Sequence, residues 1–145
     1  MKKELIYELI TGLLVLLFLY TGLSKLLDFK AFELSMRFQH LPDWITTPAI
    51  YTLPTTEIIV AGLLITEKSR MIGLYAFIAL MFIFTLYAGA VLINLFPIAP
   101  CPCGGAIKSL GWPQHFLLNL AFLGLALANL FFYNRQANPS TRKSL

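Results

Sequence analysis

The sequence predicts an all-α, polytopic membrane protein: a four-helix transmembrane bundle with a short interfacial helix in the first outer loop. Hydrophobic residues make up 58% of the 145 residues and charged residues only 12%, whereas soluble domains carry about 25% charged residues. The apolar residues form four segments, each near the roughly 20 residues that cross a bilayer. Helices are expected because backbone groups in lipid must form hydrogen bonds within the protein, and because a chain this short cannot close a β-barrel.

The four predicted spans, in chain order, cover residues 5–26, 49–65, 71–96 and 113–133. The first is not expected to be a cleaved signal peptide, because it lacks a small-residue cleavage site and continues into polar residues. A tight turn around residues 67–70 should make the second and third spans antiparallel neighbours. Residues 1–134 then form one membrane domain. The polar tail, 135–145, is expected to be disordered and cytoplasmic.

The first loop, residues 28–48, predicts a helix that lies in the membrane interface. Phe29, Phe32 and Met36 recur at helical spacing, with charged residues on the other faces. Asp28 is placed to cap this helix. Trp44 fits the aromatic belt at the membrane surface.

The distribution of basic residues predicts the orientation. Lys and Arg favour the cytoplasmic side, and the two sides of the membrane hold seven and four of them. They are Lys2, Lys3, Lys68, Arg70, Arg135, Arg142 and Lys143 against Lys25, Lys30, Arg37 and Lys108. Both termini are therefore expected in the cytoplasm, with the chain in the inner (plasma) membrane. Basic residues at span ends do not indicate a nucleic-acid partner.

The chain has two cysteines, in Cys101-Pro102-Cys103-Gly104-Gly105 between the last two spans. This loop is predicted to face the oxidising side, where disulfides persist. A structural disulfide across three residues would add only about 1.6 kcal/mol in the chain-entropy model, and its strain would make it labile. A redox-active pair is favoured. Two alternatives stay open. One is metal or copper handling, although two thiolates alone leave a tetrahedral zinc site incomplete. The other is a structural or inert role.

Two basic residues near the cysteines are candidates for tuning them. Lys108 follows Cys103 by five residues, and His115 lies near the outer end of the fourth span. A histidine there can act as a base or as a partner of a thiolate. The alternatives are a plain interfacial histidine and, for Trp112, a membrane-belt role rather than a cofactor platform.

Glu57 lies inside the second span, where an ionisable side chain is costly and rarely faces lipid. Lys25, near the outer end of the first span, is the predicted partner. The pair has two readings: an ion pair that fixes helix packing, or a proton acceptor or quinone-contacting group near the thiols. Asn94 and Asn119, near the outer ends of the third and fourth spans, are expected to add hydrogen bonds to the same pocket.

These motifs resemble the DoxX-like superfamily, and most closely its branch containing the methylamine utilisation protein MauE. The resemblance covers nearly the whole chain and rests on three motifs. They are Gly22-Leu23-Ser24-Lys25-Leu26-Leu27-Asp28-Phe29, Pro54 with Glu57, and Cys101-Pro102-Cys103-Gly104-Gly105 followed by Leu110-Gly111-Trp112. It implies a four-helix membrane bundle with Cys101 and Cys103 as a redox pair, acting in methylamine metabolism on a disulfide-rich secreted protein.

Two classes of function remain from the sequence. The first is a thiol–disulfide redox component that exchanges equivalents with a thioredoxin-like or secreted cysteine-containing partner, with a quinone as the candidate cofactor. Quinone-linked disulfide-forming membrane enzymes use a Cys-x-x-Cys pair plus further cysteines, and this chain has neither. The second class is a non-enzymatic assembly or transport factor in the bilayer.

Overall fold

The computed structural model describes residues 2–39, 41–95 and 111–137, and all regular structure in them is helical. The helices are α1 (Lys2–Leu27), α2 (Phe29–Arg37), α3 (Asp43–Ile65), α4 (Arg70–Leu92) and α5 (Trp112–Ala137). All but the short α2 are long and apolar enough to cross a membrane. The predicted four-span helical bundle is therefore confirmed. Cys101, Cys103 and Lys108 lie outside the described residues.

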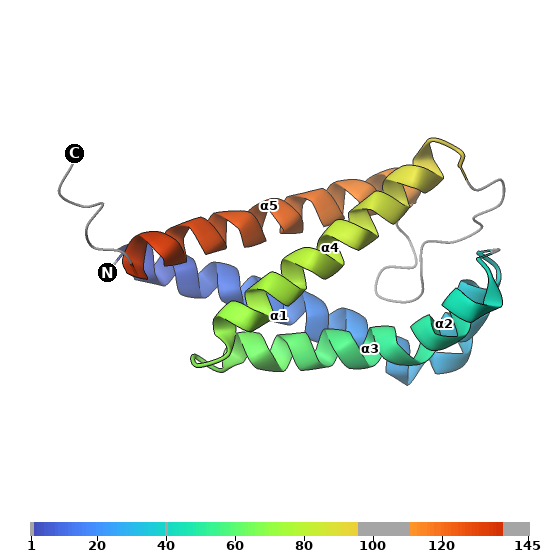
Figure 1. The fold of residues 1–145 in the computed structure, drawn as a ribbon, viewed down its shortest axis with the longest axis horizontal. Helices are drawn as coiled ribbons and strands as arrows, with labels where there is room; N and C mark the ends of the chain where they lie inside the picture. Colours follow the sequence, from blue (N-terminus) through green and yellow to red (C-terminus); the bar gives the residue numbers. More distant parts are fainter. Residues whose placement is uncertain (1, 40, 96–110, 138–145) are drawn as a thin grey trace.

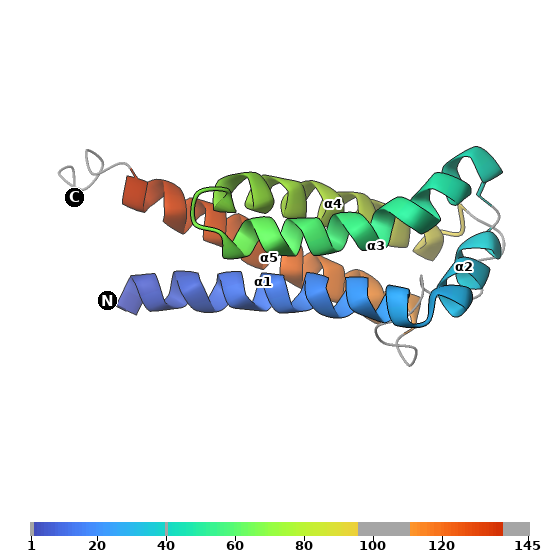
Figure 2. The ribbon, with the colours of Figure 1, turned by 90° about the horizontal axis from the view of Figure 1, so that it is seen from below.

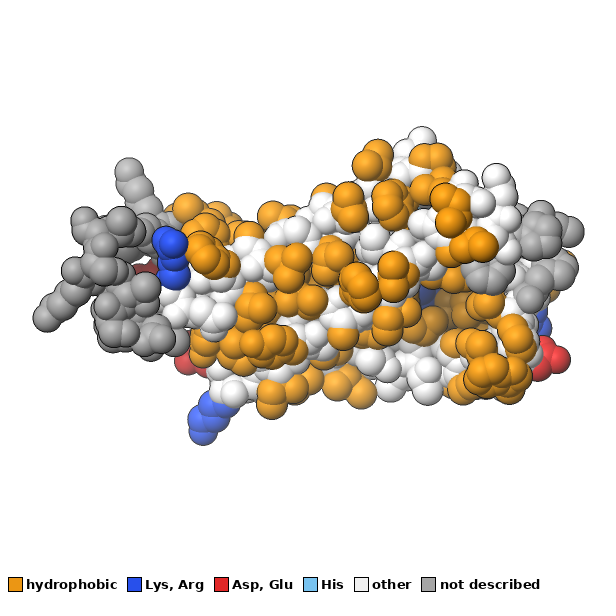
Figure 3. Space-filling view, turned by 45° about the horizontal axis from the view of Figure 1, so that its top comes forward, with side chains coloured by type: hydrophobic (Ala, Val, Ile, Leu, Met, Phe, Trp, Pro, Cys, Tyr) orange, Lys and Arg blue, Asp and Glu red, His pale blue; other side chains and the backbone are white. Residues whose placement is uncertain are grey.

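The four long helices form a ring in which α1 and α4 each pack against both α3 and α5. The beginning of α1 and the end of α5 lie at one end of the bundle, here called the termini end, and α2 lies at the other, the α2 end (Figures 1 and 2). On the face shown in Figure 3, apolar side chains cover the length of the bundle, whereas most charged side chains lie near its two ends. This distribution suits a bundle whose flanks contact lipid.

The α2 helix confirms that the first loop contains a short helix, as predicted. Its buried residues Phe32 and Met36 pack against Ile50 of α3, and the Phe29 ring lies 5.7 Å from the ring of Tyr51. Asp28 precedes the helix, but its side chain makes no capping hydrogen bond. The apolar face of α2 is thus held against α3 rather than left to the membrane interface.

The α3 helix begins at Asp43 rather than at residue 49, and Pro48 lies inside it. The first four N–H groups of any helix lack helical partners, so Pro48 removes only one bond beyond them. The bond it removes is the one to the Trp44 carbonyl, in the second turn of the helix. A loss of one bond so near the helix start explains why a helix breaker in the sequence does not mark the start of the span.

The α4 helix ends at Leu92, earlier than the predicted residue 96, because Asn94 adopts a left-handed conformation with φ 57°. The N–H of Asn94 donates to the Val91 carbonyl, and the N–H of Leu95 donates to that of Ala90. These two bonds form a Schellman motif, in which asparagine is one of the residues that tolerate the left-handed position. Asn94 therefore terminates a helix.

An apolar cluster fills the middle of the bundle, with the rings of Phe18 and Phe77 4.2 Å apart. The predicted turn between α3 and α4 is present, and the two helices pack together. A Cβ atom on Gly73 would lie 2.9 Å from the Leu64 backbone nitrogen. The absence of a side chain at Gly73 therefore allows α4 to start in direct contact with the end of α3.

Candidate functional site

A buried ion pair joins α1 to α3 at the α2 end of the bundle. Lys25 Nζ lies 2.6 Å from Glu57 Oε1, and their side chains are only 9% and 2% exposed. The predicted pairing is confirmed. A charge so deeply buried is tolerated only with a close partner, so each residue requires the other.

Gly22 allows the two helices to approach closely enough for this contact. A Cβ atom on Gly22 would lie 2.9 Å from Ile58 Cγ1 and 3.2 Å from the Pro54 carbonyl oxygen. The second of these atoms belongs to the backbone and cannot move aside cheaply. One turn after Gly22, the side chain of Lys25 therefore starts close to α3 and reaches Glu57.

Two aromatic rings complete the surroundings of the ammonium group. Lys25 Nζ lies 5.8 Å from the centre of the Phe32 ring and 6.0 Å from that of Phe84. Both distances are within the range of cation–π attraction. The charge on α1 is thus contacted by α2, α3 and α4.

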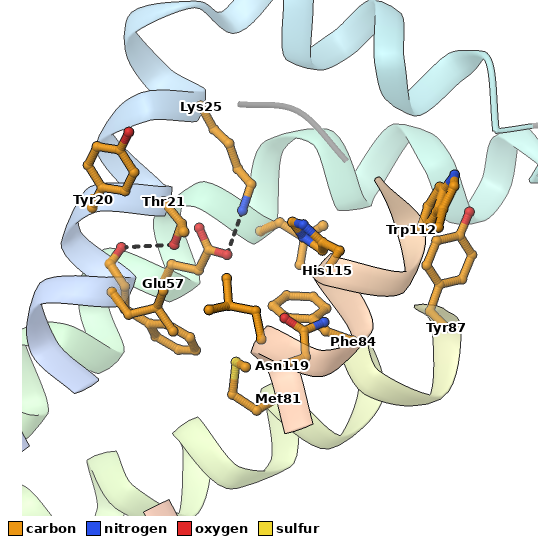
Figure 4. A pocket seen from close by; sticks show the side chains of 14 residues that line it. Tyr20, Thr21, Lys25, Glu57, Met81, Phe84, Tyr87, Trp112, His115 and Asn119 are labelled. Atoms are coloured by element: carbon orange, nitrogen blue, oxygen red, sulfur yellow. Dashed lines mark hydrogen bonds and ion pairs between the residues drawn. The ribbon is translucent and has the colours of Figure 1, made fainter. Parts of the chain in front are cut away.

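A cavity of about 110 Å³ lies beside the ion pair (Figure 4). All four long helices contribute to its wall, which is mostly aliphatic and aromatic. The lining residues are Leu17, Phe18, Tyr20, Thr21, Lys25, Leu53, Glu57, Met81, Phe84, Tyr87, Trp112, His115, Leu118 and Asn119. Phe18 and Met81 also belong to the central apolar cluster, which therefore closes the cavity on the side of the termini.

Two buried polar atoms in the wall have no hydrogen-bond partner among the described residues: Glu57 Oε2 and His115 Nδ1. Asn119 adds a third polar side chain, only 8% exposed. Figure 4 shows His115 and Asn119 extending from α5 on the side of the cavity opposite Lys25 and Glu57. Unpaired buried polar groups are rare in proteins, so the cavity wall that holds them is the candidate site.

The cavity adjoins the points where the chain leaves α4 and enters α5. Trp112 and Tyr87 are in edge-to-face contact, with ring centres 6.0 Å apart, and the Tyr87 hydroxyl donates to Gln39 Oε1. These contacts connect α4, α5 and the segment after α2. Sequence reasoning missed Tyr87 and Gln39 and placed Trp112 in the membrane belt, because apolar patterning does not distinguish a cavity wall from a lipid-facing surface.

The family comparison agrees with this architecture. Residues 3–132 match the family model of the methylamine utilisation protein MauE. The chain belongs to the MauE family. No curated protein and no solved structure matches it. This membrane protein of the MauE family thus places a buried ion pair and a cavity near the ends of the segment that contains its cysteines.

Only some of the candidate site residues predicted from the sequence lie together in the structure of this MauE-family chain. Lys25, Glu57, His115 and Asn119 all line the one cavity. Asn94 is exposed and is not part of its wall, because it ends α4. The remaining three, Cys101, Cys103 and Lys108, lie outside the described residues. Within the described ranges, no three His, Cys, Asp or Glu residues are grouped as a metal site.

Proposed function

We propose that this MauE-family protein is a thiol–disulfide redox component of the inner (plasma) membrane. Cys101 and Cys103 cycle between dithiol and disulfide. They pass redox equivalents to a thioredoxin-like or secreted cysteine-containing partner, or assist its maturation. The family match supports this proposal because it extends across the cysteine segment, and so does the small stabilisation that so short a disulfide loop would give.

The observation that favours the proposal most is where the cysteine segment is attached. It joins the end of α4 to the start of α5, and Tyr87 and Trp112 near these ends line the cavity. An extended chain spans at most about 3.4 Å per residue, so Cys101 stays within roughly 20 Å of Leu95. The chain length between Leu95 and the thiols thus limits how far they can lie from this end of the bundle, which holds the ion pair.

The proposed orientation places the termini end in the cytoplasm and the α2 end outside. The excess of Lys and Arg at the termini end supports it. Cys101 and Cys103 would then face an oxidising compartment, in which a labile disulfide can be formed again after each exchange.

The test is thiol trapping in intact cells that express Cys101→Ser, Cys103→Ser or the double variant. A redox-active pair predicts that all three accumulate normally and fail to complement a strain lacking the protein. One of the single variants should form a mixed disulfide with a partner, visible on a non-reducing gel. Reduced wild-type protein should also return to the disulfide form after the reductant is washed out.

A matched control places one new thiol in the same segment of the double variant, as Ser109→Cys. It should react with a membrane-impermeant maleimide from outside the cell, yet restore no complementation. Protection of this thiol in intact cells would overturn the orientation. Full complementation by the double Cys→Ser variant would overturn the redox role and leave the assembly or transport factor, with metal handling included, as the function.

A further inference from the structure

The charges that line the cavity balance. Lys25 contributes one positive charge and Glu57 one negative charge, 2.6 Å apart. The other ionisable side chains in the wall are His115, Tyr20 and Tyr87. A bound cation would be repelled by Lys25 and a bound anion by Glu57, and the low dielectric of the bundle strengthens both effects. The cavity therefore favours a neutral molecule.

The polar atoms specify which neutral groups fit. Glu57 Oε2 is buried and accepts no hydrogen bond from the described residues, because the Thr21 hydroxyl beside the carboxylate donates to the Phe18 carbonyl at 3.4 Å instead. A carboxylate oxygen can only accept a hydrogen bond. An ammonium group has three protons to donate, and Lys25 Nζ uses one of them on Glu57 Oε1. The pair can therefore receive a hydroxyl group at Oε2 and a carbonyl oxygen at Nζ.

The volume of the cavity limits a bound molecule to a single ring. One water needs about 10–15 Å³ of such space, and an engineered apolar cavity of about 150 Å³ takes up benzene. At 110 Å³, the cavity has room for no more than one six-membered ring. Phe18, Phe84 and Trp112 supply aromatic walls. Flat rings pack well against such walls in offset or edge-to-face contact.

The cavity reaches the lipid-facing side of the bundle. Tyr20, part of its wall, is 53% exposed and lies within the membrane span of α1. Figure 3 shows a hollow near the α2 end of the bundle, with a basic side chain inside it. A molecule dissolved in the bilayer can therefore enter sideways, with an apolar tail left among the lipids.

From these four features we infer that the cavity binds the head group of a membrane-dissolved, single-ring quinone. The oxidised ring presents a carbonyl oxygen to Lys25 Nζ, and the reduced ring presents a hydroxyl group to Glu57 Oε2. Binding is independent of the cysteines, but a catalytic use rests on the proposed function. There, oxidation of the Cys101–Cys103 dithiol to a disulfide releases two electrons and two protons, which reduce the quinone to the quinol.

The two tryptophans allow a direct binding test on the full chain in lipid nanodiscs. Trp112 lines the cavity, whereas Trp44 is 78% exposed and lies outside its wall. In Trp44→Phe, a short-chain ubiquinone analogue should quench the remaining fluorescence along a saturable curve. In Trp112→Phe, quenching of Trp44 should rise linearly, as expected from collisions in the bilayer. Linear quenching in both variants would overturn the inference.

A pair of neighbouring leucines gives matched variants in the Trp44→Phe background. Leu118 lines the cavity, whereas Leu117 is 63% exposed. Leu118→Phe should weaken the analogue's apparent affinity by about tenfold because it overfills the site, and Leu117→Phe should leave it unchanged. Equal affinities in the two variants would overturn the assignment of the site, as would tighter binding of a fused-ring naphthoquinone than of the single-ring analogue.

The same titration in a Cys101→Ser, Cys103→Ser background separates this inference from the proposed function. Saturable quenching should persist there with unchanged affinity, because the inferred hydrogen bonds are made by Lys25 and Glu57. Loss of binding would overturn the inference in its present form. Failure of thiol trapping, by contrast, would overturn the proposed function and leave the quinone site standing.

Discussion

The described residues include a buried polar contact between helices at each end of the bundle, and the two contacts differ in charge and in surroundings. At the termini end, Asn129 Nδ2 of α5 donates to Thr11 Oγ1 of α1 at 2.9 Å. At the α2 end, Lys25 of α1 meets Glu57 of α3 beside the cavity. The apolar cluster around Phe18 and Phe77 lies between them.

The two contacts show how differently the two ends of the bundle are held together. The neutral contact at the termini end joins α1 to α5, where the rings of Tyr7 and Tyr133 also meet at 5.9 Å. An amide and a hydroxyl are sufficient to hold helices together in lipid. Both ends hold buried polar atoms that have no hydrogen-bond partner among the described residues, Tyr7 Oη and Asn129 Oδ1 at the termini end and Glu57 Oε2 and His115 Nδ1 at the α2 end. The α2 end differs in its charged pair, which is far more costly to bury, and in the cavity beside it, and these two features make it the candidate site.

The largest expected effect comes from removing the negative charge of the pair. Glu57→Gln leaves Lys25 buried and unpaired, which should lower the free energy of unfolding by about 3–5 kcal/mol. Unfolding in detergent and accumulation in membranes would measure the loss. Adding Lys25→Met should recover part of it, since no unpaired charge then remains.

Glu33→Gln is the matched control for this loss of charge. Glu33 pairs with Arg37 on the surface of α2, where the two side chains are 32% and 47% exposed, and such pairs contribute about 0.3–0.5 kcal/mol. Wild-type stability in Glu57→Gln, or no recovery on adding Lys25→Met, would show that the two ends of the bundle are held by contacts of similar strength.

An intermediate effect is expected from separating α1 and α3. Gly22→Ala places a Cβ against Ile58 and the Pro54 backbone and should cost about 1–3 kcal/mol, the usual range for overpacking. Gly12→Ala in the same helix meets nothing within 4 Å and should be neutral or slightly stabilising. Equal unfolding curves for the two variants would refute the close approach at Gly22.

The smallest effect is expected at the termini end. In a double-mutant cycle, Thr11→Val and Asn129→Leu should show a coupling of about 0.6 kcal/mol, the average for hydrogen bonds between membrane helices. Chemical unfolding of the two single variants and the double variant would measure it. A coupling as large as that between Lys25 and Glu57 would remove the contrast between the two ends.

Much of the fold could be predicted from sequence because the bilayer imposes strong rules. Span length and the scarcity of charge predict the helices, and the rule that a buried charge needs a partner predicts Lys25 with Glu57. Helix ends were less predictable. The α3 helix starts before a proline that costs it only one backbone bond, and the end of α4 depends on one left-handed asparagine.

The cavity could not be predicted, because it results from packing among four helices. Phe84, Leu118 and Met81 look the same in the sequence as leucines and phenylalanines that face lipid. The contact between Tyr87 and Gln39 joins residues 48 positions apart, and no local pattern indicates it. His115 and Asn119 could be predicted as site residues because a polar side chain in an apolar span is recognisable from the sequence, whichever way it points.

The separation of Lys25 and Glu57 along the chain, 32 residues, has a consequence for how the protein is made. A ribosome produces α1 well before α3, so the ammonium group is already at the membrane when the carboxylate arrives. On translocon scales, a lone charge in the centre of a span disfavours insertion by about 2.5–3.5 kcal/mol. The first helix thus provides the partner that eases entry of the later one, and the order of segments in the gene is also a workable order of insertion.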